Sequence, residues 1–282
     1  MFSAFGPALV DYIHIIDEFP VRGGHAVVKS TYKMPGGAGC NVAHNIAKLN
    51  VKSIIFTTLG RDEDAKFFID NTAAKVIASF THDFTGRVDI YVDKTGERTF
   101  FVHPNAAGRP YVNVKPSEYL YLDPFPSNES FNIQLNVAKN SDSFVILNPG
   151  IPYVSLGFKK LSELLQYVDL LILSEFEFRY LGVSTREILK FVDYLVITQG
   201  ARGSRCYTKN KSYKAEAFKA RPIDTTGAGD AFAAGFLYCF MNEFPIETCL
   251  KVGNFCGAYN VERIGARNFP SMDEIEEILS KL

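Results

Sequence analysis

The stretch Arg221-Pro-Ile-Asp-Thr-Thr-Gly-Ala-Gly-Asp-Ala-Phe232 joins a short polar connector and a glycine turn to a helical segment. The tripeptide Gly227-Ala-Gly229 leaves little side-chain bulk on the backbone, and from Ala231 apolar residues recur at helical spacing. The start of a helix presents unpaired N–H groups and the positive end of the helix dipole, which together bind anions. Asp230 stands at this point, where a carboxylate either stabilises the dipole or acts as a base beside a bound phosphate. The stretch therefore predicts an anion site with a candidate base.

The string from Asp224 to Phe232 resembles the C-terminal signature of the ribokinase-like (PfkB) family of carbohydrate kinases, which also includes nucleoside kinases. The resemblance implies transfer of the terminal phosphoryl group of ATP, with Mg²⁺, to a primary hydroxyl of a small sugar; a nucleoside is the alternative acceptor. It assigns the general base to Asp230 and the anion hole to the backbone of Gly227, Ala228 and Gly229. A base beside preorganised N–H donors suits phosphoryl transfer.

Composition limits the classes of protein that remain. The chain has 282 residues, of which 47% are hydrophobic, enough for one large α/β domain. With 30 basic and 31 acidic residues it has no charge excess for binding nucleic acid or an anionic membrane, and no apolar run approaches the ~20 residues of a membrane span. The five cysteines contain no C-x-x-C pair. Cys239, Cys249 and Cys256 are expected to be buried thiols, and a reducing cytoplasm is the expected location.

Short apolar runs alternate with helical segments along most of the chain. Strands are expected at Ser53–Leu59, Tyr119–Leu122, Ser143–Leu147, Leu170–Leu173 and Tyr194–Thr198. This alternation predicts a doubly wound, mainly parallel sheet with helices on both faces, formed by residues 1–282 as a single ribokinase-like domain. Ligands of such sheets bind beyond the carboxyl ends of the strands. The residues that follow or end a strand-like run are Asp11, Gly36, Ser174, Thr198 and Asp224.

Two segments, at about 12–33 and 85–103, do not follow this alternation. The second contains strand-like runs on either side of a short glycine turn, which is typical of a hairpin. The segments are either edge strands of the main sheet or, as the resemblance implies, a small β-sheet lid over the acceptor site. A lid would exclude water as a competing phosphoryl acceptor. Its exposed sheet could also pair two subunits, so a homodimer through the lid is one expectation.

The resemblance also extends to Met34–Asn50, where a glycine-rich turn precedes an apolar-faced helix and matches the N-terminal signature of the family. It implies that the acceptor hydroxyls contact residues from three segments: Asp11, Gly36, Gly37, Asn41 and Asp123. An amide such as that of Asn41 suits a diol because it both donates and accepts hydrogen bonds. Read from the residues alone, Asp11 is equally compatible with a solvent-facing strand end.

For the nucleotide, the resemblance implies contacts from residues after the later strands: Ser174, Thr198, Gly200, Gly203 and Asn254. Ser174 departs from the family pattern, which has asparagine there, although a serine hydroxyl can also hydrogen-bond a phosphate. Glu177 matches a residue that acts indirectly on magnesium. Tight-turn chemistry alone would also explain both glycines.

A monovalent cation such as K⁺ is bound in some relatives by residues matching this chain. The positions implied here are Asp224, Thr226, Arg263 and Gly265.

The acceptor itself is left open by the sequence. A phosphorylated sugar would need a cationic clamp, for which the candidates near the lid are Arg87, Arg98 and His103. A nucleobase could stack on the aromatic residues of the hairpin, Tyr91, Phe100 and Phe101, although hairpin aromatics often pack across strands instead. A non-catalytic nucleotide- or sugar-binding module is a further alternative. A NAD(P)-dependent dehydrogenase is disfavoured, because no G-x-G-x-x-G opens the first strand–helix unit.

Overall fold

The computed structural model describes residues 1–111, 113–127 and 129–282. A nine-stranded sheet in the order β13-β12-β11-β10-β9-β8-β1-β4-β5 forms its centre. The strands are β1 (Phe2–Phe5), β4 (Ser53–Leu59), β5 (Lys75–Phe80), β8 (Tyr119–Leu122), β9 (Phe144–Leu147), β10 (Leu170–Ser174), β11 (Tyr194–Thr198), β12 (Ser204–Tyr207) and β13 (Ser212–Ala215). The strands from β11 to β5 are parallel, and β12 and β13 add an antiparallel edge. The predicted doubly wound, mainly parallel sheet is confirmed.

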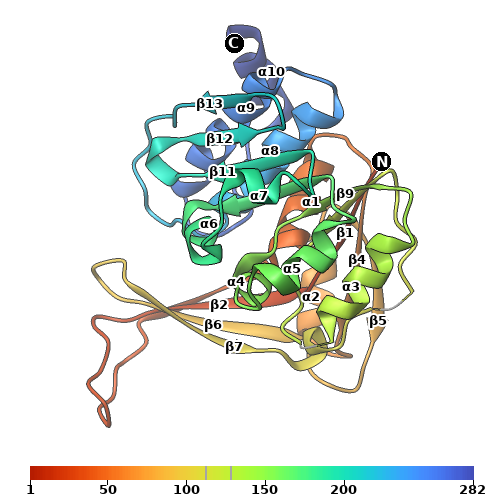
Figure 1. Ribbon diagram of the computed structural model, residues 1–282. Coiled ribbons are helices and arrows are strands. Elements are labelled where there is room, and N and C mark those ends of the chain that lie inside the picture. The colour runs from red at the N-terminus through yellow and green to blue at the C-terminus, as the bar shows by residue number, and fades with distance from the viewer. Residues whose placement is uncertain (112, 128) are drawn as a thin grey trace.

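Helices cover both faces of this sheet (Figure 1). The helices are α1 (Ala38–Lys48), α2 (Glu63–Asp70), α3 (Ser130–Lys139), α4 (Gly150–Val154), α5 (Phe158–Leu165), α6 (Glu175–Leu181), α7 (Thr185–Ile188), α8 (Ala228–Met241), α9 (Ile246–Val261) and α10 (Met272–Lys281). Strand side chains alternate between the two faces, so β8 contributes Tyr121 to one apolar core and its neighbours Leu120 and Leu122 to the other. The first core contains residues of α1, α2, α8, α9 and α10, and the second contains residues of α3 to α7.

A second, small sheet stands apart from the body (Figure 1). It has four strands in the order β3 (Ser30–Gly36), β2 (Leu9–Ile15), β6 (Gly86–Val92) and β7 (Arg98–His103). Pairing in register gives it two different faces. One face carries Asp11, and an apolar cluster centred on Ile13, Val88 and Ile90 adjoins it. The other face carries polar side chains such as Tyr12 and Asp89.

Two expected strand positions are wrong. Asp11 lies in the middle of β2 and not at a strand end, because the chain leaves β1 at Phe5 and enters the small sheet at Leu9. Asp224 does not follow a strand either: β13 ends at Ala215, and an irregular segment leads to α8. The amide N–H groups of Ile223 and Asp224 both donate to the carbonyl of Val261 at the end of α9, which holds this segment in place without a sheet.

A local capping signal sets the start of α2. Asp62 is the N-cap of α2, accepting a hydrogen bond from the amide of Ala65 at 2.8 Å. All five cysteines are free and buried, as expected for Cys239, Cys249 and Cys256. None of the helices in the described residues is both long enough and apolar enough to cross a membrane.

Candidate active site

The glycine turn before α8 forms a close junction with the loop that follows α9. Gly227 has a φ of 76°, and a Cβ atom there would lie 2.4 Å from the Cα of Ala266, so glycine is required by both conformation and space. The amide of Ala228 donates to the carbonyl of Thr225 at 3.3 Å. Among the described residues, the amides of Gly227 and Gly229 have no hydrogen-bond acceptor. Two of the three expected anion-hole amides are therefore free to bind an anion.

Asp230 in the first turn of α8 lies against the start of α1. The Asn41 Nδ2 donates to the Asp230 Oδ2 at 2.9 Å, joining residues that are 189 apart in the sequence. The Asn41 Oδ1 in turn accepts a hydrogen bond from the Arg267 Nε at 2.9 Å. The two glycine-rich turns of the sequence thus meet at one carboxylate.

Two further carboxylates adjoin this point. Asp11 packs on Gly36, where a Cβ atom would lie 2.5 Å from its Oδ1. Asp123, directly after β8, accepts a hydrogen bond from the amide of Gly39 at 2.8 Å. Burial raises the pKa of Asp11 to about 7, against the positive charge of Arg267. Burial likewise raises the pKa of Asp123 to about 7 and that of Asp230 to about 6.

The mutual arrangement of these carboxylates is electrostatically unfavourable. Asp230 raises the pKa of both Asp11 and Asp123 by charge repulsion. Raised carboxyl pKa values gathered in one place are typical of functional sites, because stability alone does not favour them.

Gly37, which precedes α1, has a φ of 95°, and a Cβ atom added there would lie 2.1 Å from the carbonyl oxygen of Pro7.

The residues expected to contact nucleotide lie at the ends of β10 and β11. Ser174 and Glu177 form a capping box at the start of α6, in which the Glu177 Oε2 accepts from the Ser174 amide at 2.6 Å. Thr198 ends β11, and its Oγ1 donates to the carbonyl of Leu173 at 3.4 Å. The capping box gives Ser174 a structural role that explains serine at this position.

Gly200 has a φ of 57°, and an added Cβ atom would meet nothing within 4 Å.

The two other expected nucleotide residues lie near the end of β13. Gly203 has a φ of 87°, and a Cβ atom there would lie 2.0 Å from the carbonyl oxygen of Ala215. The Asn254 Nδ2 donates to the carbonyls of Ala215 and Glu216 at 3.1 and 3.0 Å. Asn254 thereby fastens α9 to the segment after β13.

The guanidinium of Arg98 from β7 donates hydrogen bonds to side-chain oxygens expected to bind a monovalent cation. Its Nη1 donates to the Thr226 Oγ1 at 2.7 Å and to the Asp224 Oδ1 at 3.2 Å, and its Nη2 donates to the Thr225 Oγ1 at 2.6 Å. The Asp224 Oδ2 accepts from the amide of Gly265 at 2.9 Å. A guanidinium on these oxygens supplies the positive charge that a cation would supply.

The rest of the expected cation loop is also engaged. The carbonyl of Gly265 accepts hydrogen bonds from Asn260 and Asn268 at 3.2 and 2.8 Å. Arg263 donates to the carbonyl of Tyr259 at 2.9 Å and stacks over its ring. As placed, Asp224, Thr226, Arg263 and Gly265 do not fit a monovalent cation.

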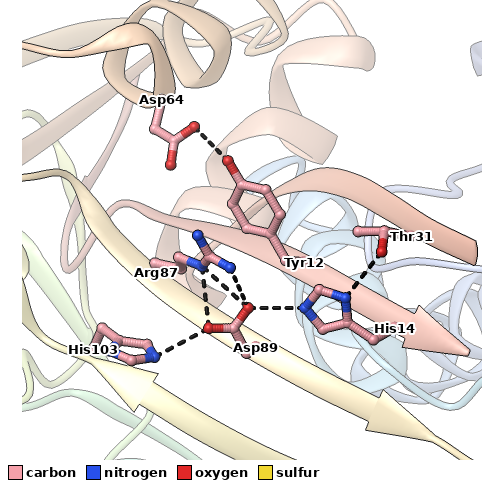
Figure 2. Close-up of polar contacts among 7 residues, drawn as sticks. All are labelled: Tyr12, His14, Thr31, Asp64, Arg87, Asp89 and His103. Atoms are coloured by element: carbon pink, nitrogen blue, oxygen red, sulfur yellow. Dashed lines mark hydrogen bonds and ion pairs between the residues drawn. The ribbon is translucent and has the colours of Figure 1, made fainter. Parts of the chain in front are cut away.

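Two of the three cationic side chains expected to form a phosphate clamp, Arg87 and His103, pair with Asp89 on the polar face of the small sheet (Figure 2). The Arg87 Nε donates to both oxygens of Asp89 at 3.1 Å. His14 and His103 contact the same carboxylate at 2.9 and 3.0 Å. These residues lie on the face opposite Asp11, so Arg87 and His103 do not point toward the carboxylates at α8.

The aromatic residues of the hairpin are divided between the two faces. Tyr91 and Phe101 lie on the polar face, where their rings meet edge to face at 5.8 Å. Phe100 lies on the Asp11 face and is 50% exposed.

Arg267 is the site residue that sequence reasoning missed. It belongs to the loop after α9 and reaches Asn41 across 226 residues of sequence. Nothing in the local pattern signals this contact, because an arginine in a polar loop is ordinarily solvated. Within the described ranges, no three His, Cys, Asp or Glu side chains are grouped so as to hold a metal ion.

Comparisons with known proteins show which chains this one is similar to. Residues 2–273 match the pfkB family of carbohydrate kinases. A nucleoside kinase of Methanocaldococcus jannaschii is 28% identical over 296 residues, covering 99% of this chain and 96% of that protein. A probable fructokinase-7 of Arabidopsis thaliana is 26% identical over 319 residues, covering 98% and 91%. The crystal structure of the M. jannaschii nucleoside kinase matches with a TM-score of 0.88 at 26% identity, covering 99% and 98%. A ribokinase structure from Thermotoga maritima matches with a TM-score of 0.87 at 26% identity, with the same coverage.

Proposed function

Because this chain belongs to the pfkB family of carbohydrate kinases, we propose that it transfers the terminal phosphoryl group of ATP to a primary hydroxyl of a small, uncharged sugar. Family membership makes the chain a phosphotransferase with a hydroxyl acceptor. The observation that carries the finer proposal is the hydrogen bond from Asn41 to Asp230, because it brings the acceptor-side turn to a carboxylate at the start of α8.

In the proposed reaction the terminal phosphate lies over the free amides of Gly227 and Gly229. Asp230 takes the proton of the acceptor hydroxyl, the freed oxygen forms a bond to phosphorus, and the bond from phosphorus to the bridging oxygen breaks. The electron pair of that bond leaves with ADP. The amides stabilise negative charge on the phosphoryl oxygens without having to reorient.

Mg²⁺ bound with the nucleotide would neutralise charge on the phosphate oxygens. It prefers oxygen ligands and usually retains several waters, so it does not need a cage of protein side chains. Glu177 fits an indirect role: its Oε2 is engaged with Ser174, and its Oε1 has no hydrogen-bond partner among the described residues. That oxygen is available to a magnesium-bound water.

The proposal of an uncharged acceptor follows from the positions of the cations. Arg87 and His103 are paired with Asp89 on the opposite face of the small sheet, and Arg98 is paired with Asp224. Three carboxylates with raised pKa values already adjoin the site, so a phosphorylated acceptor would add negative charge where repulsion is strongest.

A nucleoside is the second candidate acceptor. The face of the small sheet that carries Asp11 adjoins an apolar cluster that includes Ile13, Val88, Ile90 and Met34. Met34 also packs against Gly265 in the loop after α9. An apolar face above a polyol site would suit a flat base attached to the sugar.

One assay separates these proposals. The protein is incubated with magnesium-ATP and a panel of free sugars, phosphorylated sugars and nucleosides, and ADP release is measured. We expect turnover with uncharged sugars or nucleosides and little with their phosphorylated forms. Preference for a phosphorylated sugar would contradict the uncharged acceptor, and no turnover on a broad panel would favour a non-catalytic binding module.

The pH dependence of the reaction should report on Asp230. Burial raises its pKa from 3.8 to about 6, against the hydrogen bond from Asn41 and the charge of Arg267. Only the ionised carboxylate accepts the proton, so kcat/KM is expected to fall about tenfold per pH unit below about pH 6. Initial rates at several acceptor concentrations from about pH 4.5 to about pH 8 would test this. If kcat/KM instead begins to fall near pH 7 as the pH is lowered, Asp11 or Asp123 is the controlling group.

The small sheet is proposed to act as a lid and to pair with a second copy of the chain. Strand β7 is at the edge of the sheet, and its residues Phe100, Phe101 and Val102 are 50%, 55% and 52% exposed. Side chains alternate between faces, so both faces are uncovered at this edge. An unpaired edge with exposed aromatic residues favours association.

Sedimentation velocity would test the dimer. We expect a dimeric mass for the wild type at micromolar concentration and a shift toward monomer in Phe101→Ser. Phe84→Ser is the matched control, because Phe84 is 75% exposed but lies outside the small sheet. A monomeric wild type, or an equal shift in both variants, would contradict pairing through the small sheet.

A further inference from the structure

Arg267 sits behind the proposed base and is held at three points. Its Nε donates to the Asn41 Oδ1 at 2.9 Å. Its Nη1 donates to the carbonyl of Asn71 at 2.8 Å and to the Thr72 Oγ1 at 2.9 Å. Its Nη2 is buried and has no partner among the described residues. The side chain therefore links the loop after α9, the end of α2 and the start of α1.

The contact with Asn41 fixes which way its amide faces. A guanidinium can only donate hydrogen bonds, so the atom of Asn41 that meets it must be the carbonyl oxygen. The NH₂ group of the same amide is then directed at the Asp230 Oδ2, 2.9 Å away. Without Arg267 the amide could turn over and present its oxygen to a carboxylate, which would be repulsive.

Arg267 also provides the positive charge that acts on the carboxylates. The titratable groups that face this region are Asp11 on β2, Asp123 after β8, Cys40 and His44 on α1, Asp224 before α8 and Asp230 on α8. The charge of Arg267 lowers the pKa of Asp11 and of Asp230, against the effect of burial. Burial lowers the pKa of Arg267 itself to about 10, so it remains charged at neutral pH.

We propose that Arg267 is a positioning residue for phosphoryl transfer: acting through Asn41, it keeps the carboxylate of Asp230 ionised and aimed at the acceptor hydroxyl. This inference rests on the proposed role of Asp230. It adds a residue from the loop after α9, outside both glycine-rich turns, to the machinery of the reaction.

The competing explanation is a purely structural role, in which Arg267 fastens its loop to the end of α2. Both roles use the same hydrogen bonds from Nε and Nη1, so the contacts alone do not separate them. The two roles differ in what they predict for the pH profile.

The test uses Arg267→Met in the full chain, with the pH profile of kcat/KM as the readout. Removing the charge should move the acid limb up by about one pH unit. The loss should be about 50-fold near pH 5 and shrink below about tenfold at pH 9, where Asp230 is ionised in both proteins. A loss of the same factor at every pH would overturn the proposal.

Two further variants keep the test decisive. Thr72→Val removes a partner on the α2 side, and it should leave the acid limb where it is and kcat/KM within about threefold. Arg267→Lys keeps the charge but not the geometry of the guanidinium, so it should lose several-fold in kcat with the limb close to that of the wild type. It also serves if Arg267→Met does not fold.

A double-mutant cycle separates this inference from the proposed function. In an Asp230→Asn background, Arg267→Met should lower the residual turnover by less than about threefold, because the group it positions is absent. An equally large loss in that background would show a structural role. If Asp230→Asn retains the wild-type turnover, the proposed function is wrong. If Asp230→Asn loses turnover but Arg267→Met leaves the acid limb of kcat/KM unmoved, only the proposed role of Arg267 is wrong.

Discussion

Replacing Asp230 by asparagine is expected to lower kcat by about 10²–10⁴-fold, the usual contribution of a general base. Asparagine has nearly the same shape and can still accept the hydrogen bond from Asn41, but it cannot take up a proton. The free amides of Gly227 and Gly229 are untouched by the change. The affinity for ATP should therefore stay within about threefold, so the loss should appear in kcat and not in nucleotide binding.

The measurement combines steady-state kinetics with calorimetric titration of ATP. Asp193→Asn is the matched control, because Asp193 is 62% exposed and, among the described residues, its side chain pairs only with Lys209, also 62% exposed. It should keep kcat within about twofold, since exposed ion pairs contribute little. Turnover of the best acceptor at the wild-type rate by Asp230→Asn would exclude this carboxylate as the base.

Thermal unfolding shows whether the variant has lost activity by unfolding. The folded state raises the pKa of Asp230 from 3.8 to about 6, mainly through burial. Between these pH values the folded chain binds more protons at this group than the unfolded chain does, so wild-type stability falls as the pH rises. Asp230→Asn lacks this titration. Its Tm relative to the wild type should therefore rise from about pH 4 to about pH 6 and remain higher above that range.

The architecture could be predicted from the sequence because short apolar runs and helical periods are local signals. The run Tyr194–Thr198 is strand β11 residue for residue, and Tyr119–Leu122 is strand β8. The prediction that Asp11 ends a strand is wrong because the apolar stretch around it contains two strands. These strands are separated at Gly6 and Pro7 and belong to different sheets. Periodicity identifies a strand but not the sheet it joins.

Side-chain placement in the site depended on register and on distant contacts, which local patterns do not encode. Arg87 and Arg98 are both basic residues on one hairpin, yet pairing places them on opposite faces. Only Arg98 then reaches Asp224, while Arg87 is held by Asp89. A one-residue change in pairing would exchange the two faces. Ser174 departs from the family pattern, and the capping box with Glu177 gives it a role that its sequence neighbours alone did not reveal.

Alanine at Gly227 and alanine at Gly229 should have opposite effects on stability, although the two glycines are two residues apart. Gly227 has a φ of 76°, and an added Cβ atom would lie 2.4 Å from both the Cα and the Cβ of Ala266. The left-handed conformation and the overlap together should destabilise Gly227→Ala by about 2–4 kcal/mol. At Gly229 an added Cβ atom meets nothing within 4 Å, and the residue is helical. Gly229→Ala should therefore be as stable as the wild type, or more stable by about 0.5–1 kcal/mol.

Activity should not follow stability in this pair. The open space at Gly229 lies beside the free amides proposed to hold the migrating phosphoryl group, so a methyl group there should lower kcat by about 10²-fold, comparable to losing one oxyanion donor. Chemical denaturation and steady-state kinetics on both variants would test this. Full activity in a stable Gly229→Ala would mean that the phosphoryl group does not pass over residue 229. A stable but inactive Gly229→Ala, beside an unstable Gly227→Ala, would separate the glycine needed for folding from the glycine needed for catalysis.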